Sequence, residues 1–104
     1  MSWRSITEAQ LWDEINASVL RMDPPQARLW ECVKIDPEKW QEARFGNSAG
    51  GFWAVAVMGQ TVVWYNDIED GFNCSAYVRY GVIEKYAGDQ SNLEVALQHL
   101  LNRL

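Results

Sequence analysis

The stretch that decides the fold is FWAVAVMGQTVVWYN, which runs from residue 52 to residue 66. Two runs rich in β-branched and aromatic residues, 52–58 and 61–66, are separated by the pair Gly59-Gln60. Residues of this kind favour strands, and a Gly-X pair between two such runs suits a type II′ turn. The sequence therefore predicts an antiparallel hairpin over these fifteen residues.

The register of this hairpin follows from its short turn. A two-residue turn places Val57 opposite Val62 and Val55 opposite Trp64. One face of the hairpin then carries valine and tryptophan, and the other carries alanines small enough to let a helix approach closely. The valine and tryptophan face needs either a cover from the same chain or a partner.

Helical periodicity marks both ends of the chain. Apolar residues recur at intervals of three and four over 6–22 and again over 93–104, as they do on one face of a helix. Each run begins close to the S-x-x-E spacing of a capping box, at 5–8 and at 91–94. The pair Pro24-Pro25 ends the first helix, because proline cannot continue the helical hydrogen-bond ladder.

Further strands are expected between the first helix and the hairpin, and again after the hairpin. The segment 37–45 has two readings: a short helix capped by Asp36 with Pro37 at its first position, or a turn that leads into a strand. We favour the second, and we expect 46–51, which is rich in glycine, to be a flexible loop. The expected strands are 27–35, 40–45, 74–80 and 82–86.

Together these elements predict one α+β domain over residues 1–104. It has an N-terminal helix, an antiparallel meander of four or five strands, and a C-terminal helix. The helices should lie mainly on one face of the sheet, because two helices of this size can hardly cover both. A chain of 104 residues with 48% hydrophobic residues has the material for a single core.

Composition argues against several classes of function. The net charge is −5 and the nine basic residues are scattered, so we expect no nucleic-acid partner. No apolar run approaches the roughly 20 residues that span a bilayer, and the first residues lack the apolar stretch of a secretory signal. Cys32 and Cys74 are too few for a disulfide framework. We expect a cytoplasmic protein with reduced cysteines and no membrane partner.

The candidate site is the acidic segment that follows the hairpin. Three carboxylates fall within four positions, and no Lys or Arg occurs between residues 45 and 78. Asp70-Gly71 is a strong turn signal, which places the acids on a loop, where functional residues are common. Three aromatic residues bracket the acids. The predicted partner-binding residues are therefore Asp67, Glu69, Asp70, Trp64, Tyr65 and Phe72.

Tests for specific chemistry fail at this segment and elsewhere. The EF-hand pattern fails because Ile68 and Tyr77 stand at ligand positions. His99 is the only histidine and has no cysteine near it in the sequence, so the spacing suggests no Cys-His or Ser-His-Asp set. The loop 46–51 lacks the Gly-Lys-Ser/Thr ending of a phosphate-binding loop. The sequence therefore predicts no catalytic residue, no metal and no cofactor.

The string W-Y-N-D-I-E-x-G-F-N at residues 64–73 resembles a string in small, single-domain bacterial proteins of unassigned function. The resemblance extends over 52–101 and implies no established activity. Small acidic α+β proteins of this kind also resemble immunity proteins, which neutralise toxins by binding them. By analogy of size, charge and class, the resemblance implies a binding role. The further residues that carry it are Ser75, Tyr77, Gly81, Ile83 and Tyr86.

These observations favour a non-enzymatic domain that binds a protein partner, with a basic partner suited to the acids. The carboxylates would supply charge complementarity, and the aromatic residues would supply contact area. One alternative is a ligand-binding or enzymatic domain, with a cleft near the acidic loop and the 46–51 loop. Another is a homodimer formed across the aromatic sheet face.

Overall fold

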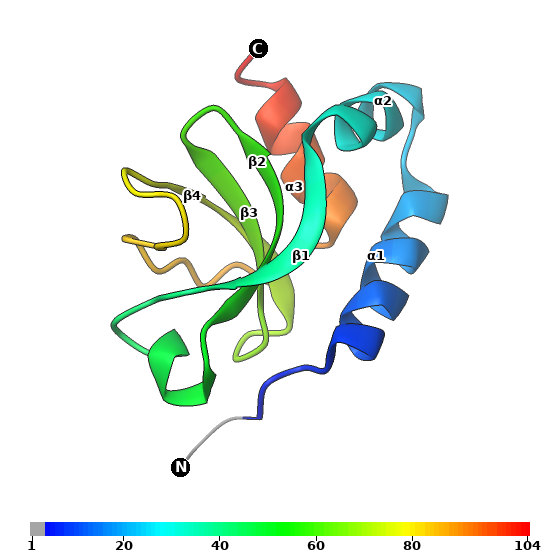
Figure 1. The fold of residues 1–104 in the computed structure, drawn as a ribbon. Helices are drawn as coiled ribbons and strands as arrows, with labels where there is room; N and C mark the ends of the chain where they lie inside the picture. The colour runs from blue at the N-terminus through cyan, green and yellow to red at the C-terminus, as the bar shows by residue number, and fades with distance from the viewer. Residues whose placement is uncertain (1–3) are drawn as a thin grey trace.

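The structure is a computed structural model that describes residues 4–104, apart from the side chains of residues 48 and 49. Within that range it contains three α-helices and one antiparallel sheet of four strands in the order β1-β2-β3-β4 (Figure 1). The predicted α+β meander with a helix near each end is therefore confirmed. The elements are α1 (Glu8–Arg21), α2 (Pro24–Val33), β1 (Lys34–Trp40), the 3-10 helix η1 (Gly46–Ala49), β2 (Phe52–Met58), β3 (Thr61–Asn66), β4 (Gly71–Ala76) and α3 (Leu93–Leu101).

The hairpin of β2 and β3 is confirmed, with one change of register. Val57 pairs with Val62 as predicted, and the turn glycine has the positive φ of 58° that a type II′ turn requires. Further along, the register shifts at a bulge around Val55, so that Ala54 rather than Val55 lies opposite Trp64. A bulge inserts one extra residue in one strand, which moves every later pair by one position.

The predicted strand over 27–35 is wrong, because most of this segment forms α2. Asp23 caps the helix by accepting a hydrogen bond from the backbone of Gln26 at 3.1 Å, and the Gln26 side chain accepts one from the backbone of Asp23 at 3.0 Å. The two prolines occupy the first helical turn, where no backbone N–H is needed. Trp30 and Val33 are spaced three apart and both are buried, so the apolar pattern also fits a helix.

Both predicted capping boxes are replaced by other arrangements. The first helix is capped by Thr7, whose side chain bonds to the backbone of Gln10, two positions after the predicted cap at residue 5. The last helix has Asn92 at its N-cap with no side-chain hydrogen bond. Glu94, in the first turn of this helix, forms an ion pair with Arg21 at 2.6 Å.

β1 replaces the turn and short strand expected over 37–45. It is an edge strand, and it contains Pro37, whose missing N–H is tolerated at a sheet edge. A register shift in the β1–β2 ladder spans this proline. The 46–51 segment, expected to be a flexible loop, contains η1.

The chain after β4 also differs from the prediction. β4 ends at Ala76, so the expected strand 74–80 is too long, and the expected strand 82–86 is absent from the described residues. Residues 77–92 instead form an irregular segment that touches the sheet through isolated bridges at Val82 and Ser91. Figure 1 shows this segment, coloured yellow to orange, to one side of the sheet.

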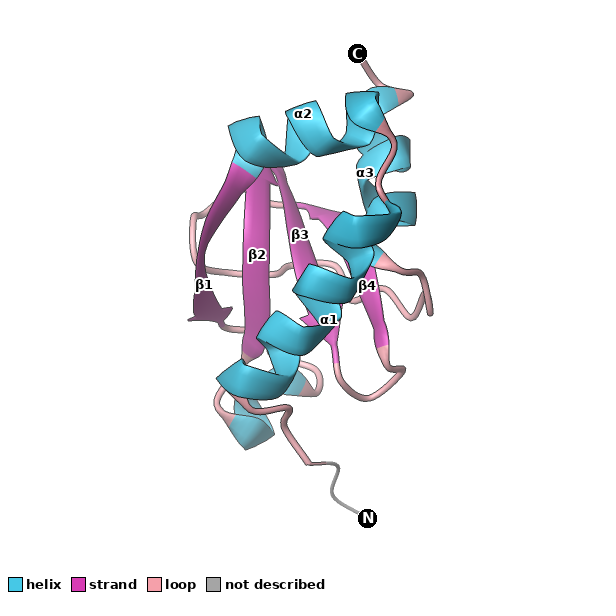
Figure 2. Ribbon diagram, turned by 90° about the vertical axis from the view of Figure 1, so that its right-hand side faces the viewer, coloured by secondary structure: helices cyan, strands magenta, loops and turns pink. Residues whose placement is uncertain are grey.

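Two clusters of buried side chains make up the core. The first joins apolar residues of α1, α2 and α3 to strand residues such as Val55, Val63 and Phe72. Figure 2 shows these helices and strands in a second view. The second contains no helix residue. It consists of Trp40, Phe52, Ala54, Val62, Trp64 and Ile83, with Tyr86 packed against it. The tryptophan face of the hairpin is therefore covered by the chain's own segment 77–92.

Two further sequence-based expectations concern membranes and cysteines. No helix within residues 4–104 is long and apolar enough to cross a membrane. Both cysteines carry free thiols in this structure. Cys32 is exposed and lies on α2 rather than in the expected strand, whereas Cys74 is half-buried on β4.

Candidate functional site

The acidic loop between β3 and β4 is shaped by its first neighbour, Asn66. This residue is fully buried, and its side-chain oxygen accepts hydrogen bonds from the backbone of Ile68 at 3.0 Å and of Glu69 at 3.2 Å. An asparagine bonded in this way folds the chain that follows it into a turn. Asp70 completes the turn with a φ of 56°, a left-handed conformation that aspartate tolerates better than most residues. The predicted loop is confirmed.

Two asparagines of the same string also fasten the segment 77–92. The amide of Asn66 donates to the backbone oxygen of Ala87 at 2.9 Å. The side-chain oxygen of Asn73 accepts a hydrogen bond from the backbone of Asp89 at 2.7 Å. Both asparagines are buried, where a polar group without a partner would cost stability. The string thus has a structural role: it holds the segment 77–92 against the second core cluster.

The three aromatic residues predicted to bind a partner lie inside the molecule. The exposed fractions of Trp64, Tyr65 and Phe72 are 0%, 5% and 2%. Trp64 belongs to the second core cluster, and the rings of Tyr65 and Phe72 pack edge to face in the first, 5.0 Å apart. The predicted aromatic contact surface beside the acids is therefore corrected: these rings are core, because the sheet is covered on both sides.

The acids have different surroundings. Asp67 and Glu69 are half-buried and Asp70 is exposed. Asp67 and Asp70 line a pocket of about 430 Å³, which we call the acidic pocket, together with Asp13 and Glu14 of α1. Glu69 does not line it. Asp13 is more than 50 positions from the loop in sequence, and the packing of α1 brings it into the same pocket. The remaining lining residues are Arg4, Ser5, Ile6, Gln10 and Tyr65.

Asp67 is the most constrained acid of the pocket. Its Oδ2 accepts a hydrogen bond from the backbone of Ile6 at 2.7 Å. Its Oδ1 is buried and has no hydrogen-bond partner among residues 4–104. Burial raises the pKa of Asp67 above its ordinary value. The backbone N–H groups of Ile6 and Asp67, the charge of Lys39 and the nearby Ser5 hydroxyl offset only part of this rise. The folded protein therefore holds this carboxylate in a poorly solvated position.

The wall of the pocket next to Asp67 is the chain segment before α1. The Trp53 indole donates to the backbone oxygen of Ile6 at 3.1 Å, and Lys39 donates to the Ser5 hydroxyl at 2.6 Å. Burial lowers the pKa of Lys39, while the charge of Asp67 acts in the opposite direction. Together with the bond from Ile6 to Asp67, these long-range contacts fix the short segment against the sheet.

Tyr65 forms part of the pocket floor. Its burial, together with the carboxylates of Glu14, Asp70 and Asp67, raises the pKa of Tyr65 to about 12. The phenol is therefore neutral near pH 7, and the negative charge of the pocket comes from the carboxylates alone.

No ion pair within residues 4–104 neutralises the four carboxylates of the pocket. The ion pairs in that range are Arg21–Glu94 and Lys34–Glu31, and neither involves the pocket. In the same part of the chain no group of three or more His, Cys, Asp or Glu side chains is arranged to hold a metal ion. Clustered carboxylates of this kind attract ammonium and guanidinium groups, and guanidinium can bind a carboxylate through two hydrogen bonds.

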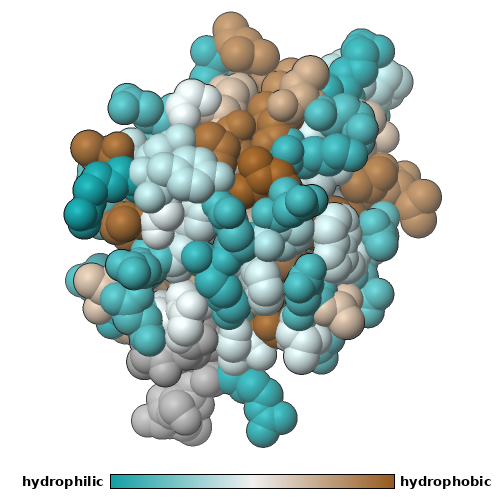
Figure 3. Space-filling model, in the orientation of Figure 1, coloured by the Kyte–Doolittle hydropathy of each residue, from teal (hydrophilic) through white to brown (hydrophobic). Residues whose placement is uncertain are grey.

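The surface that the structure describes offers no single aromatic face. The large hydrophobic side chains that are most exposed belong to different parts of the fold: Leu20 on α1, Val78 and Tyr80 in the covering segment, and Leu104 after α3. In Figure 3 hydrophobic side chains gather in the upper half of the view, and the lower half is mostly hydrophilic or neutral. The aromatic sheet face expected to form a homodimer is buried under segment 77–92.

We compared the chain with protein-family models, with curated proteins and with solved structures, and none of the three comparisons found a match. The chemistry of the acidic pocket is therefore inferred from its residues and their geometry.

Proposed function

We propose that the protein is a non-enzymatic binding domain that recognises a basic segment of a protein partner through the acidic pocket. The observation that carries the proposal is the half-buried Asp67, with one oxygen unpartnered among the described residues, beside Asp13, Glu14 and Asp70. Arg4 lines the pocket and Lys39 acts on Asp67, but neither forms an ion pair with the four acids within residues 4–104. An arginine or lysine side chain of the partner would supply further donors and the positive charge that pairs with them. We also infer that the helices lie mainly on one face of the sheet, so that α1 and the β3–β4 loop frame the pocket.

The state of Asp67 supports a role in recognition. A carboxylate whose pKa is raised by burial gives up folding stability when it ionises. Residues that weaken the fold in this way concentrate at functional sites, where an incoming partner can compensate the cost. A cation bound in the acidic pocket would do this for Asp67.

The acids should contribute in different ways. Asp13, Glu14 and Asp70 lie at the exposed rim, where charges mainly speed association and are screened by salt. Asp67 is less exposed, so its pairing with a cation should mainly slow dissociation. Binding should therefore weaken at high ionic strength without being abolished.

If such a partner is neutralised by being bound, the protein acts as an immunity-type inhibitor, the role implied by the sequence resemblance. The net charge of −5 supports this role, because it favours encounter with a basic partner. A cytoplasmic location, as expected from the sequence, suits it.

The proposal is tested by fluorescence anisotropy with a labelled hexa-arginine peptide, and with hexa-glutamate as the opposite probe. The site variant combines Asp13→Asn, Glu14→Gln and Asp70→Asn. Its matched control removes three charges elsewhere, by Glu31→Gln, Asp36→Asn and Glu84→Gln. We expect the site variant to bind hexa-arginine about tenfold more weakly, or about 1.4 kcal/mol, and the control to change much less.

Equal losses in the two triple variants would mean that only net charge matters, and would contradict the proposal. The absence of hexa-arginine binding to the unmodified protein would also contradict it. Thermal unfolding of each variant checks that the fold is retained.

A further inference from the structure

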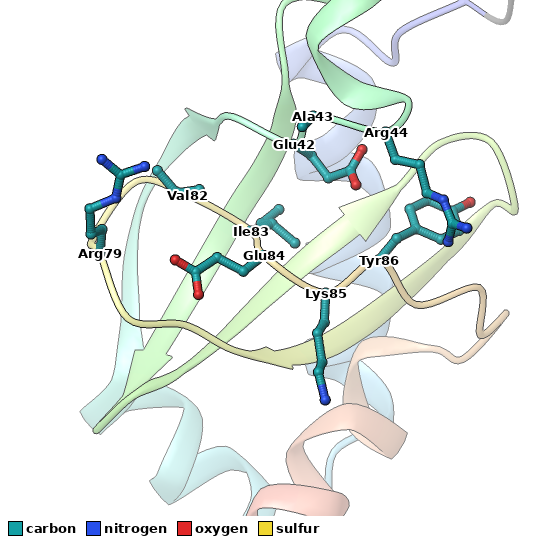
Figure 4. Close-up of a pocket in the computed structure, with 9 residues that line it drawn as sticks. All are labelled: Glu42, Ala43, Arg44, Arg79, Val82, Ile83, Glu84, Lys85 and Tyr86. Atoms are coloured by element: carbon teal, nitrogen blue, oxygen red, sulfur yellow. The ribbon is translucent and has the colours of Figure 1, made fainter.

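A second pocket, of about 570 Å³, is bounded by residues 42–44, which follow β1, and by residues of the segment 79–86 (Figure 4). The two segments are held side by side by backbone hydrogen bonds. Gln41 donates to Gly81 at 2.9 Å and accepts from Ile83 at 2.8 Å. This pocket shares no lining residue with the acidic pocket.

The rim of this pocket concentrates positive charge on an acidic protein. Three of the nine basic residues of the chain line it, namely Arg44, Arg79 and Lys85. None of the three takes part in an ion pair within residues 4–104. The guanidinium of Arg44 lies over the ring of Phe45, 5.8 Å from its centre. These cations are therefore available to an anionic ligand.

Two carboxylates also line the pocket, but they differ in availability. Glu42 is 3% exposed, and its Oε1 accepts backbone hydrogen bonds from Phe45 at 2.6 Å and from Gly46 at 3.0 Å. Glu84 is exposed, and Figure 4 shows its carboxylate on the side of Arg79. Glu84 is thus the one rim acid whose removal should favour an anionic ligand.

The arrangement of the cations sets the shape of the ligand. Figure 4 shows Arg79 and Arg44 at opposite ends of the pocket, with Val82 and Ile83 between them. A compact anion such as phosphate would match only the charged groups and not the apolar residue between them. An elongated ligand matches both, if it has acidic groups at its ends and an apolar group between them.

We propose that this pocket binds an extended acidic peptide, whose carboxylates pair with Arg44 and Arg79 and one of whose apolar side chains lies over the half-buried Val82. Arginine binds carboxylates through paired hydrogen bonds. The partly exposed side chain of Val82, between the two ends, would be covered by an apolar group of the peptide, which adds a smaller favourable contribution. A single-stranded nucleic acid fits less well, because its phosphates follow one another without a break, whereas the pocket has arginines at its two ends and Val82 between them. The inference is independent of the basic partner of the acidic pocket, since the two pockets have different residues and opposite charge.

The test uses fluorescence anisotropy with a labelled peptide of alternating glutamate and alanine residues, with oligothymidylate and inorganic phosphate as competitors. The variant Arg44→Gln with Arg79→Gln should bind the peptide about tenfold more weakly. Glu84→Gln should bind it more tightly, by about two- to threefold. The matched control, Arg28→Gln with Arg103→Gln, should stay within about twofold of the unmodified protein.

Four results would overturn the proposal: no binding of the peptide by the unmodified protein, an equal loss in the control variant, stronger binding of oligothymidylate than of the peptide, or full competition by phosphate at equal concentration. Lys85→Gln serves as a second rim variant if the double arginine variant unfolds at lower temperature than the unmodified protein. The charge-removal variant of the acidic pocket should bind the acidic peptide at least as well as the unmodified protein. That last comparison separates failure of one pocket from failure of the other.

Discussion

The carboxylate of Asp67 accepts a hydrogen bond from the backbone N–H of Ile6, 61 positions earlier in the chain, at 2.7 Å. This contact joins the segment before α1 to the acidic loop, and it leaves the second oxygen of Asp67 buried without a partner among the described residues. One side chain therefore both holds the segment before α1 in place and carries a carboxylate oxygen that has no hydrogen-bond partner among the described residues. That combination makes Asp67 the centre of the predictions for the acidic pocket.

Replacing Asp67 by asparagine should separate its structural role from its charge. The amide oxygen introduced by Asp67→Asn would still accept the hydrogen bond from Ile6, and the desolvated carboxylate would be gone. The free energy of unfolding should therefore stay the same or rise by up to about 1 kcal/mol. Urea unfolding measures this. The matched control is Asp70→Asn on the exposed part of the loop, which should change stability by less than about 0.5 kcal/mol. A loss of more than about 1 kcal/mol in Asp67→Asn would show that the charge itself holds the segment.

The stability difference between Asp67→Asn and the unmodified protein should depend on pH. The pKa of Asp67 is raised in the folded state, so its contribution to stability is fully present below its ordinary value and is lost as pH rises through the raised value. The unmodified protein should therefore lose stability relative to the variant as pH increases from about 4 towards 7. Thermal midpoints of both proteins across that range give the difference. A constant difference, or one that shrinks with rising pH, would contradict the assigned pKa direction.

Gly71 should be required for the close packing of the segment 77–92 against β4. A Cβ placed there would lie 2.5 Å from the Cα of Gln90, which is backbone and cannot move aside cheaply. We expect Gly71→Ala to lower the free energy of unfolding by about 1–3 kcal/mol and to loosen the segment 77–92. Hydrogen exchange of the backbone amides of that segment reports the loosening.

Gly88→Ala is the matched control, because a Cβ at this position would meet only ordinary contacts at 3.9 Å. Its effect should be within about 0.5 kcal/mol. Similar losses at Gly71 and Gly88 would mean that glycine is needed for chain flexibility rather than for close approach.

Asn66 should matter more for stability than the acids beside it. Asn66 is fully buried, and Asn66→Ala removes its side-chain amide. The backbone N–H of Ile68 then loses its acceptor, and the backbone oxygen of Ala87 loses its donor. Unsatisfied buried groups cost about 1–3 kcal/mol each, so urea unfolding should show a loss of at least that size. Asn16→Ala, on an exposed turn of α1, should cause no loss. A small effect of Asn66→Ala would mean that water replaces its hydrogen bonds.

The parts of the fold that the sequence predicts are those set by local signals. The Gly59-Gln60 pair between two β-rich runs defines the hairpin, and the 3.6-residue periodicity of leucines defines α3. α2 was missed because Trp30 and Val33 satisfy helical spacing within a run that also alternates like a strand. The signal that could have found it is Asp23-Pro24-Pro25-Gln26, a cap followed by prolines in the first turn.

The position of residues 77–92 over the second core cluster could not be predicted, because this segment has neither helical nor strand periodicity. It is held by contacts with Asn66 and Asn73, which are distant in sequence from the groups they bind. The sequence therefore predicts an open aromatic sheet face, whereas the structure shows that this face forms a second core. Two of the four acids of the acidic pocket, Asp67 and Asp70, are predicted from the sequence because they are close together in it. Asp13 and Glu14 come from α1, and only tertiary packing brings them to the pocket.

The most direct test of recognition through the acidic pocket is the dissociation constant of labelled hexa-arginine for the unmodified protein and for Asp67→Asn, measured at about 50 mM and about 300 mM sodium chloride. If Asp67 pairs with an incoming cation, the variant binds about tenfold more weakly at both salt concentrations, although it is at least as stable as the unmodified protein. Equal affinity of the two proteins at both salt concentrations would contradict that role.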